Sequence, residues 1–337
     1  MKTATTTSIR IQSPTRVDLA GGTLDCWPLH LFVGDCVTVN LSIDIWTGCE
    51  LTPAAGREVT LEIRDLKFTK TYRDIDEVVQ SEDKEILLVQ KILEHYRPQL
   101  GFHLSTFSQS PVGGGLGGSS SLCISLIQAL NRWQKIEMST AEAVELAHNL
   151  EAKVIKNPTG TQDYYPALVP GLNIIHYTAA GRRVETVPFD SEVFRQNMML
   201  IYTGKSHHSG INNWQVIKSV IEGDGATLAA LKEIAKISEA TAQVCREGQW
   251  SELPELFRSE FDSRIKLTSS FSSPEIEKLK KLAIAEGAQA VKICGAGGGG
   301  CVLIWAPASS HKGISEQCQR NGFQPLKVQP VRGLSPR

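Results

Sequence analysis

The stretch PVGGGLGGSSSL, residues 111–122, decides the fold of this 337-residue chain more than any other part of its sequence. Glycine can adopt positive φ and has no Cβ, so such a run leaves backbone N–H groups free to approach a ligand. A hydrophobic core gives no reason for so many glycines in one place. We therefore expect this backbone to hold an anion, in the first place a phosphate, and the glycines concerned are Gly113, Gly114, Gly115, Gly117 and Gly118.

The residues after the glycines predict the start of a helix. Ser119–Ser121 are followed by apolar side chains at helical spacing, namely Leu122, Leu126, Ile127 and Leu130. A helix N-terminus adds unpaired N–H donors and about half a positive charge to the same place. The glycines and the helix therefore favour the same anion.

The composition indicates a globular protein of two domains. Hydrophobic residues make up 41% and charged residues 21%, and the length fits two domains with a cleft between them. A net charge of −1 gives no reason to expect nucleic acid as a partner. No apolar run approaches the roughly 20 residues that span a bilayer, so we expect no membrane association and a cytoplasmic location. Eight cysteines without a C-x-x-C pair predict reduced, mostly buried thiols.

Hydrophobic periodicity predicts an α+β organisation. Residues 8–17 and 36–45 alternate like half-buried strands, and residues 86–96 and 141–155 have helical spacing. The second of these helices should end before Asn157-Pro158. A new alternation of strands and helices begins at residue 198, so we place a domain boundary near residue 190, giving domains 1–190 and 191–337.

The glycine run has simpler explanations, a flexible linker or a tight turn, but its place between two apolar elements argues against a linker. No lysine follows the glycines, which excludes the G-x-x-x-x-G-K-[ST] loop, and no acidic residue ends a strand at the spacing of a dinucleotide site. The phosphate loop is therefore of another kind.

At these residues the chain resembles the GHMP kinases, the family of galactokinase, homoserine kinase, mevalonate kinase and phosphomevalonate kinase, whose loop reads P-x-G-x-G-L-G-S-S. The matches are Pro111, Gly113, Gly115, Leu116, Gly117 and Ser119, while Gly118 stands where a serine is usual. Residues 13–25 (SPTRVDLAGGTLD) and 292–304 (KICGAGGGGCVLI) are similar to two further family motifs, in the family's order and spacing.

The resemblance implies a two-domain fold, with an N-terminal ribosomal-protein-like βαβ domain and a C-terminal ferredoxin-like α/β sandwich. It also implies ATP and Mg²⁺ as cofactors. ATP would be held by Pro111, Gly113, Gly114, Gly115, Leu116, Gly117, Gly118, Ser119 and Ser120, and the metal by Ser119 and Glu151. Without the resemblance, Glu151 would be an ordinary glutamate on a solvated helix face.

Asp163 and Arg16 are the catalytic residues that the resemblance implies. Asp163 matches the family's aspartate a dozen residues after the metal-binding glutamate, where it would accept the acceptor's proton, and Arg16 would hold that carboxylate ionised. From the residues alone, Asp163 could close an Asx turn and Arg16 could face solvent.

The acceptor site implied by the resemblance combines three segments. Its residues are Gly22, Thr23 and Asp25 of the first motif, His207 of TGKSHHSGINNW, and Gly297 and Gly298 of the second glycine run. The run at 295–300 could instead be a plain hairpin turn, and the adjacent histidines 207 and 208 could suggest a metal site, although no cysteine or acidic residue stands at ligand spacing.

The acceptor that fits best is a sugar or sugar phosphate, as in the heptose-phosphate and fucose/galactose branch of the family. The NPTG at 157–160 resembles a mevalonate kinase segment and keeps a mevalonate-type acid open. A non-catalytic nucleotide sensor is the alternative of another class. A homodimer is compatible with all three hypotheses.

Overall fold

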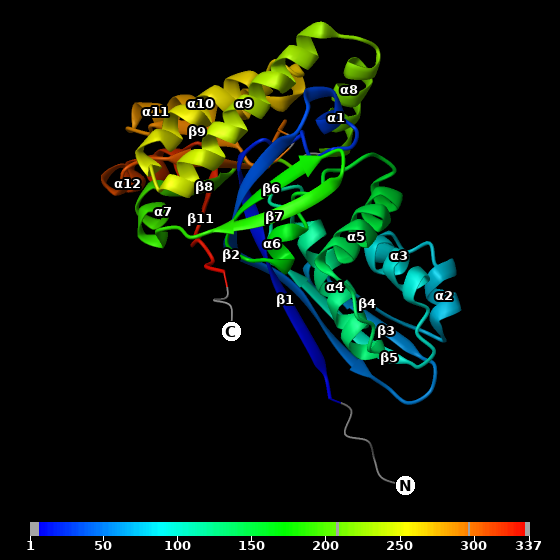
Figure 1. Cartoon of the computed structure of the whole chain (residues 1–337). Coiled ribbons are helices and arrows are strands. Elements are labelled where there is room, and N and C mark those ends of the chain that lie inside the picture. The colour runs from blue at the N-terminus through cyan, green and yellow to red at the C-terminus, as the bar shows by residue number, and fades with distance from the viewer. Residues whose placement is uncertain (1–6, 207–208, 296, 334–337) are drawn as a thin grey trace.

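The computed structural model describes residues 7–206, 209–295 and 297–333, and it folds into two sheets with their helices (Figure 1). The first sheet has seven strands in the order β4-β3-β5-β2-β6-β7, with β1 paired to β2. The strands of this sheet are β1 (Ile9–Ala20), β2 (Cys36–Pro53), β3 (Val59–Ile63), β4 (Phe68–Tyr72), β5 (Phe102–Ser108), β6 (Leu172–Thr178) and β7 (Gly181–Val187).

Strand β2 is one continuous strand of 18 residues, whereas the turn residues after residue 45 predict a separate short strand there. It stays continuous because it has partners along both halves: residues 36–41 pair with β6 and residues 47–53 with β5. Gly48 does not break the strand. A Cβ there would lie within 2.8 Å of both the Ile11 carbonyl oxygen and the Phe107 ring, so the glycine lets strand β1 and that ring approach closely.

Most helices of the first half pack on one another and on the first sheet, whereas α1 lies beside helices of the second half (Figure 1). α4 lies against both β1 and β2, and α5 and α3 lie next to it. α5 begins at a capping box formed by Ser139 and Glu142, and it ends before Pro158 as expected. The helices of this half are α1 (Leu29–Val33), α2 (Ile75–Gln80), α3 (Leu87–Tyr96), α4 (Gly118–Gln134), α5 (Thr140–Ile155) and α6 (Tyr165–Leu168), with the 3₁₀ turns η1 (Arg64–Leu66) and η2 (Lys84–Ile86).

The second sheet is antiparallel, has four strands in the order β11-β8-β10-β9, and is accompanied by the remaining helices. Helices separate β8 from β9, and α12 separates β10 from β11, which gives the ferredoxin-like arrangement that was expected. Its elements are α7 (Ser191–Asn197), β8 (Met198–Tyr202), α8 (Ser209–Ile221), α9 (Gly225–Glu247), η3 (Trp250–Glu252), α10 (Leu253–Arg264), η4 (Ser269–Phe271), α11 (Pro274–Ala285), β9 (Ala290–Ile293), β10 (Cys301–Trp305), α12 (Ala308–Arg320) and β11 (Gln324–Leu326).

The two halves are in close contact. α9 packs against β2 of the first sheet, and the C-terminal segment returns to the first half, where the Val331 N–H donates to the Ser42 carbonyl at 2.8 Å. The predicted boundary at residue 190 lies between β7 and β8, the last strand of one sheet and the first of the other. All eight cysteines are buried and unpaired, as the sequence predicts. Within the described ranges, no helix is long and apolar enough to cross a membrane.

Candidate active site

A cavity of about 380 Å³ lies where the end of β1, the glycine loop, residues 159–163 and the second half of the chain meet. It takes side chains from both halves, since Asn213 of α8 and Arg264 of α10 line it together with the N-terminal segments. Most of the predicted site residues line this cavity, namely Arg16, Gly22, Thr23, Asp25, Pro111, Gly113, Gly114, Gly115, Gly117, Gly118, Ser119, Ser120, Glu151 and Asp163.

The glycine loop has the positive φ angles that its sequence predicts. Gly113, Gly115 and Gly117 have φ of 63°, 71° and 70°, a region that L side chains rarely adopt, and α4 begins directly after them at Gly118. A Cβ on Gly117 would lie 3.2 Å from the Asp163 side chain. The absence of that atom lets Asp163 approach the loop.

Gly118 departs from the family pattern, and the structure gives the reason. Its φ is not positive, but a Cβ at this position would lie 2.8 Å from both Cβ and Oγ of Ser110. The Ser110 side chain therefore fills the space that a serine at 118 would need. Gly118 and Ser110 form a complementary pair.

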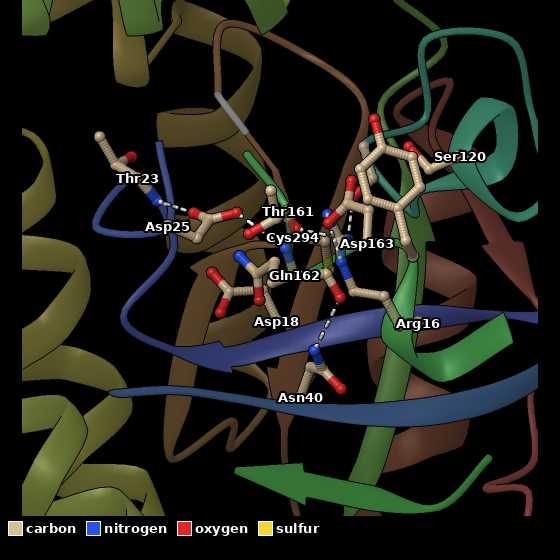
Figure 2. A network of polar contacts seen from close by, with 12 residues as sticks. Arg16, Asp18, Thr23, Asp25, Asn40, Ser120, Thr161, Gln162, Asp163 and Cys294 are labelled. Carbon is tan, nitrogen blue, oxygen red and sulfur yellow. Dashed lines mark hydrogen bonds and ion pairs between the residues drawn. The ribbon is translucent and has the colours of Figure 1, made fainter. Parts of the chain in front are cut away.

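Arg16 and Asp163 form an ion pair beside the loop (Figure 2). The Arg16 Nε and Nη2 both donate to Asp163 Oδ1, at 2.8 and 2.5 Å, and Nη1 donates to the carbonyls of Gly115 and Cys294, at 2.6 and 2.9 Å. Arg16 is only 3% exposed, which excludes the solvent-facing alternative. Burial opposes the charged guanidinium, but the attraction of the Asp163 and Asp18 carboxylates outweighs it and raises the pKa of Arg16.

Asp25 is buried next to this pair and accepts hydrogen bonds from two backbone N–H groups. Its Oδ1 accepts from the Thr23 N–H at 3.1 Å and its Oδ2 from the Gln162 N–H at 3.0 Å. Gly160 allows this contact, because a Cβ there would lie only 1.9 Å from Asp25 Oδ2. Burial and the nearby Asp163 carboxylate raise the pKa of Asp25 to about 6. Asp25 therefore lines the cavity, although Leu24 separates it from Thr23, an extra residue relative to the family's G-G-T-D motif.

Glu151 is buried and holds two hydroxyl groups. Its Oε2 accepts from Ser120 Oγ at 2.7 Å and from the Tyr164 hydroxyl at 2.6 Å, which excludes a solvated helix face. Ser119, the predicted metal ligand, is exposed and lines the cavity one residue earlier. The sequence missed Ser120 as the direct partner of Glu151, and a run of three serines offers no signal for choosing among them.

The second glycine run braces the first. A Cβ on Gly295 would lie 2.8 Å from the Gly115 Cα, and the Cys301 N–H donates to the Gly114 carbonyl at 2.7 Å. Gly297 and Gly298 do not line the cavity. Both have positive φ, and they pack against the Ser270–Phe271 backbone, where a Cβ on Gly297 would lie 2.2 Å from the Phe271 carbonyl oxygen. Leu116 is buried in the core, and its carbonyl accepts from the Arg16 N–H.

Four buried charged side chains form a cluster of ion pairs, which we call the charge quartet: Asp18, Glu260, Arg264 and Lys292. Each is at most 1% exposed. Arg264 Nη2 pairs with Asp18 at 3.0 Å and with Glu260, while Lys292 Nζ donates to the Asp18 carbonyl at 2.7 Å. Burial opposes ionisation, yet Lys292, Arg264 and Arg16 lower the pKa of Asp18.

The sequence missed this quartet. Asp18 and Lys292 stood within quoted motifs, and Asp18 also lies two residues after Arg16 on β1 and so shares its side of the strand, but Glu260 and Arg264 carried no signal. Of the remaining predicted residues, His207 lies outside the described residues. Lys205, from the same segment, pairs with Glu275 and does not line the cavity.

The comparisons with known proteins agree with this geometry. Residues 86–171 match the model of the GHMP kinases N terminal domain, and residues 223–323 match that of the GHMP kinases C terminal domain. A D-glycero-alpha-D-manno-heptose 7-phosphate kinase of Campylobacter jejuni is 25% identical over 94% of this chain and 95% of its own length. A mevalonate kinase of Thermococcus onnurineus is 28% identical over 75% of this chain and 73% of its own.

Among solved structures, a D-glycero-D-manno-heptose 1-phosphate kinase from Bacteroides thetaiotaomicron superposes with a TM-score of 0.77 at 19% identity, covering 97% of each chain. This likeness supports the fold. The two family models together span more than half of the chain. Together with the glycine loop, its brace and the Arg16–Asp163 pair, they establish that the chain belongs to the GHMP kinases, phosphotransferases that act on a hydroxyl group.

Proposed function

We propose that this chain transfers the γ-phosphoryl group of ATP to a hydroxyl of a sugar or sugar phosphate. The observation that carries the proposal is the Arg16–Asp163 pair, held against the backbone of the glycine loop. A phosphate on the N–H groups of that loop would lie next to the carboxylate. Phosphoryl transfer depends mainly on such positioning and on charge stabilisation.

Asp163 would accept the proton of the acceptor hydroxyl. Both hydrogen bonds from Arg16 to Asp163 go to Oδ1, which leaves Oδ2 for the hydroxyl. A carboxylate is a weak base, so its effect depends on alignment. Four hydrogen bonds fix the Arg16 guanidinium, two of them to backbone carbonyls, and they supply that alignment.

The residues around Glu151 fit Mg²⁺. A carboxylate and serine hydroxyls are the hard oxygen donors that this ion prefers, and Ser119, Ser120 and Glu151 all line the cavity. Among the described residues no cluster of three histidine, cysteine or acidic side chains could hold a metal alone, so the nucleotide's phosphates would supply further ligands. When bound, the ion would neutralise charge on the transferred phosphate.

The apolar part of the cavity would receive the nucleoside. Its large aliphatic side chains all belong to the N-terminal half, whereas Arg264 and Asn213 come from the second half, and they are Leu66, Leu88, Val112, Leu122 and Ile155. Apolar walls with a few polar groups are the usual environment for a nucleobase. The acceptor would then occupy the opposite end, beside Asp25 and Asp163.

A sugar-type acceptor is favoured over a mevalonate-type acid for two reasons. The Campylobacter jejuni relative named a heptose 7-phosphate kinase matches along nearly the whole chain, whereas the mevalonate kinase match covers three quarters. The acceptor end also presents the Asp25 carboxylate, which has no ion-pair partner among the described residues and would repel a carboxylate substrate. The intact Arg16–Asp163 pair argues against a non-catalytic sensor.

A coupled assay of ADP release tests the proposal. The panel contains free hexoses and heptoses, their phosphate esters and mevalonate, each with ATP and Mg²⁺. We expect turnover with at least one sugar or sugar ester. ATP binding without phosphorylation of any compound would refute the proposal and favour a non-catalytic nucleotide sensor. Turnover of mevalonate alone would identify the chain as a kinase of a mevalonate-type acid.

A further inference from the structure

Three side chains of the acceptor end carry a buried polar atom that has no hydrogen-bond partner within the described part of the chain. These atoms are Asp18 Oδ1, Gln162 Oε1 and Arg264 Nε. The side chains are at most 4% exposed, and all three residues line the cavity together with Asp25 (Figure 2 shows Asp18, Asp25 and Gln162). Buried polar atoms without partners are rare in folded proteins, and at a binding site a ligand can supply the partner. Two of the three atoms are oxygens that accept hydrogen bonds.

The charge that lines the cavity is predominantly negative. Within the described ranges its ionisable lining residues are Arg16 and Arg264 and the acids Asp18, Asp25, Asp65, Glu151 and Asp163. Both guanidinium groups are already engaged, Arg16 by Asp163 and Arg264 by Asp18 and Glu260. An anionic group on the acceptor would therefore find both lining arginines already paired. It would also lie beside Asp25, a carboxylate that has no ion-pair partner among the described residues.

We propose that the acceptor is an uncharged polyol, a free sugar rather than a sugar phosphate, and that Asp18 and Gln162 bind its hydroxyl groups alongside Asp25. This inference rests on the proposed kinase function and narrows its substrate class. Sugar hydroxyls donate to carboxylate oxygens and both donate to and accept from an amide, which is the set of groups found here. Within the charge quartet, Arg264 and Lys292 both donate to Asp18 Oδ2. Oδ1 of Asp18 is therefore the oxygen left for the ligand.

Matched pairs of acceptors test the substrate class directly. D-galactose, D-mannose and D-glycero-D-manno-heptose are compared with galactose 6-phosphate, mannose 6-phosphate and the heptose 7-phosphate, on the full chain with saturating Mg-ATP. We expect kcat/KM for the best free sugar to exceed that of its ester by about 100-fold, because like charges would be brought together in the ester complex. An equal or higher kcat/KM for the ester would overturn the inference while leaving the kinase function intact.

The role of Gln162 is tested with Gln162→Leu, which keeps the backbone N–H that holds Asp25. The acceptor KM should rise about tenfold, with the KM for ATP within about twofold of wild type. The matched control is Gln90→Leu, because Gln90 is a second buried glutamine that does not line the cavity and donates to the carbonyls of Val78, Val79 and Ser81. The control should lower the melting temperature without changing the acceptor KM. An unchanged acceptor KM in Gln162→Leu would remove that residue from the site.

Binding decides the inference if no compound is phosphorylated. Calorimetric titration of each sugar and its ester, in the presence of a non-hydrolysable ATP analogue, then replaces kcat/KM as the measure. Preferential binding of the free sugar would keep the inference although the kinase function had failed. Preferential binding of the ester, or no binding of either, would overturn it.

Discussion

In the proposed function, the two ends of the cavity bind their ligands with different parts of the chain. At the nucleotide end the glycine loop presents backbone groups, and a second glycine run packs directly on the first, with Gly295 against Gly115. At the acceptor end single charged side chains converge from distant positions, as in the pairing of Asp18 with Arg264 across 246 residues of sequence. The nucleotide end therefore depends on glycines, which have no side chain, and the acceptor end depends on particular charged side chains.

This difference predicts where substitutions will be costly. A backbone site tolerates changes in neighbouring side chains as long as the loop keeps its shape, because its donors are N–H groups. A site of buried charges does not, because removal of one partner leaves another charge uncompensated in a poorly solvated place. The following experiments can break or sharpen this contrast.

Asp163→Asn should have the largest effect. The amide cannot accept the acceptor's proton, so kcat should fall about 10³-fold, which corresponds to about 4 kcal/mol of transition-state stabilisation. Coupled ADP release measures kcat, and circular dichroism with ATP titration checks that the fold and nucleotide binding persist. Asp76→Asn is the control, since Asp76 is an exposed aspartate on α2 that pairs with Arg97. Wild-type kcat in folded Asp163→Asn would end its assignment as the base.

Lys292→Met should have the second largest effect, on stability. The substitution keeps the volume but leaves Asp18 and Glu260 with Arg264 as their remaining partner in the quartet. The free energy of unfolding should fall by about 3–5 kcal/mol, measured by urea denaturation. The double variant Glu260→Gln/Lys292→Met removes one charge of each sign and should recover a large part of that loss. Equal losses in the single and double variants would show that charge balance does not govern this cluster.

The same contrast explains what could be predicted from the sequence. The glycine loop, the helix that follows it and the alternation of strands and helices in the second half are encoded in local runs, where a few adjacent residues decide the conformation. The ferredoxin-like arrangement of that half came from the family resemblance. The site residues Asp163, Arg16 and Asp25 came from motif resemblance. Arg264 had no signal at all, because a single arginine on an amphipathic helix looks like any other until the fold brings it to Asp18.

The pH dependence of acceptor use should follow Asp25. Its pKa is raised to about 6, so the ionised form that accepts hydrogen bonds from hydroxyl groups is lost below that pH. We expect kcat/KM for the acceptor to fall about tenfold per pH unit below pH 6, a limb that Asp25→Asn should lack. Because the folded protein binds this proton more tightly than the unfolded chain, Asp25 also makes the free energy of unfolding decrease as the pH rises from about 4 to 6. A wild-type profile flat between pH 5 and 7 would contradict this assignment.

Gly118→Ser should have the smallest effect, because it alters the nucleotide end and leaves every backbone donor of the loop in place. The new Cβ would lie 2.8 Å from the Ser110 side chain, so the loop must shift slightly. We expect the KM for ATP to rise about threefold to tenfold and stability to fall by about 1 kcal/mol, with the acceptor KM unchanged. Ser110→Gly in the same chain removes the crowding atoms and should restore the KM for ATP, whereas Ser110→Gly alone should have little effect. If the KM for ATP of the double variant were as high as that of Gly118→Ser, Gly118 and Ser110 would not be a complementary pair. The glycine loop would then depend on the side chain at position 118, just as the acceptor end depends on its side chains.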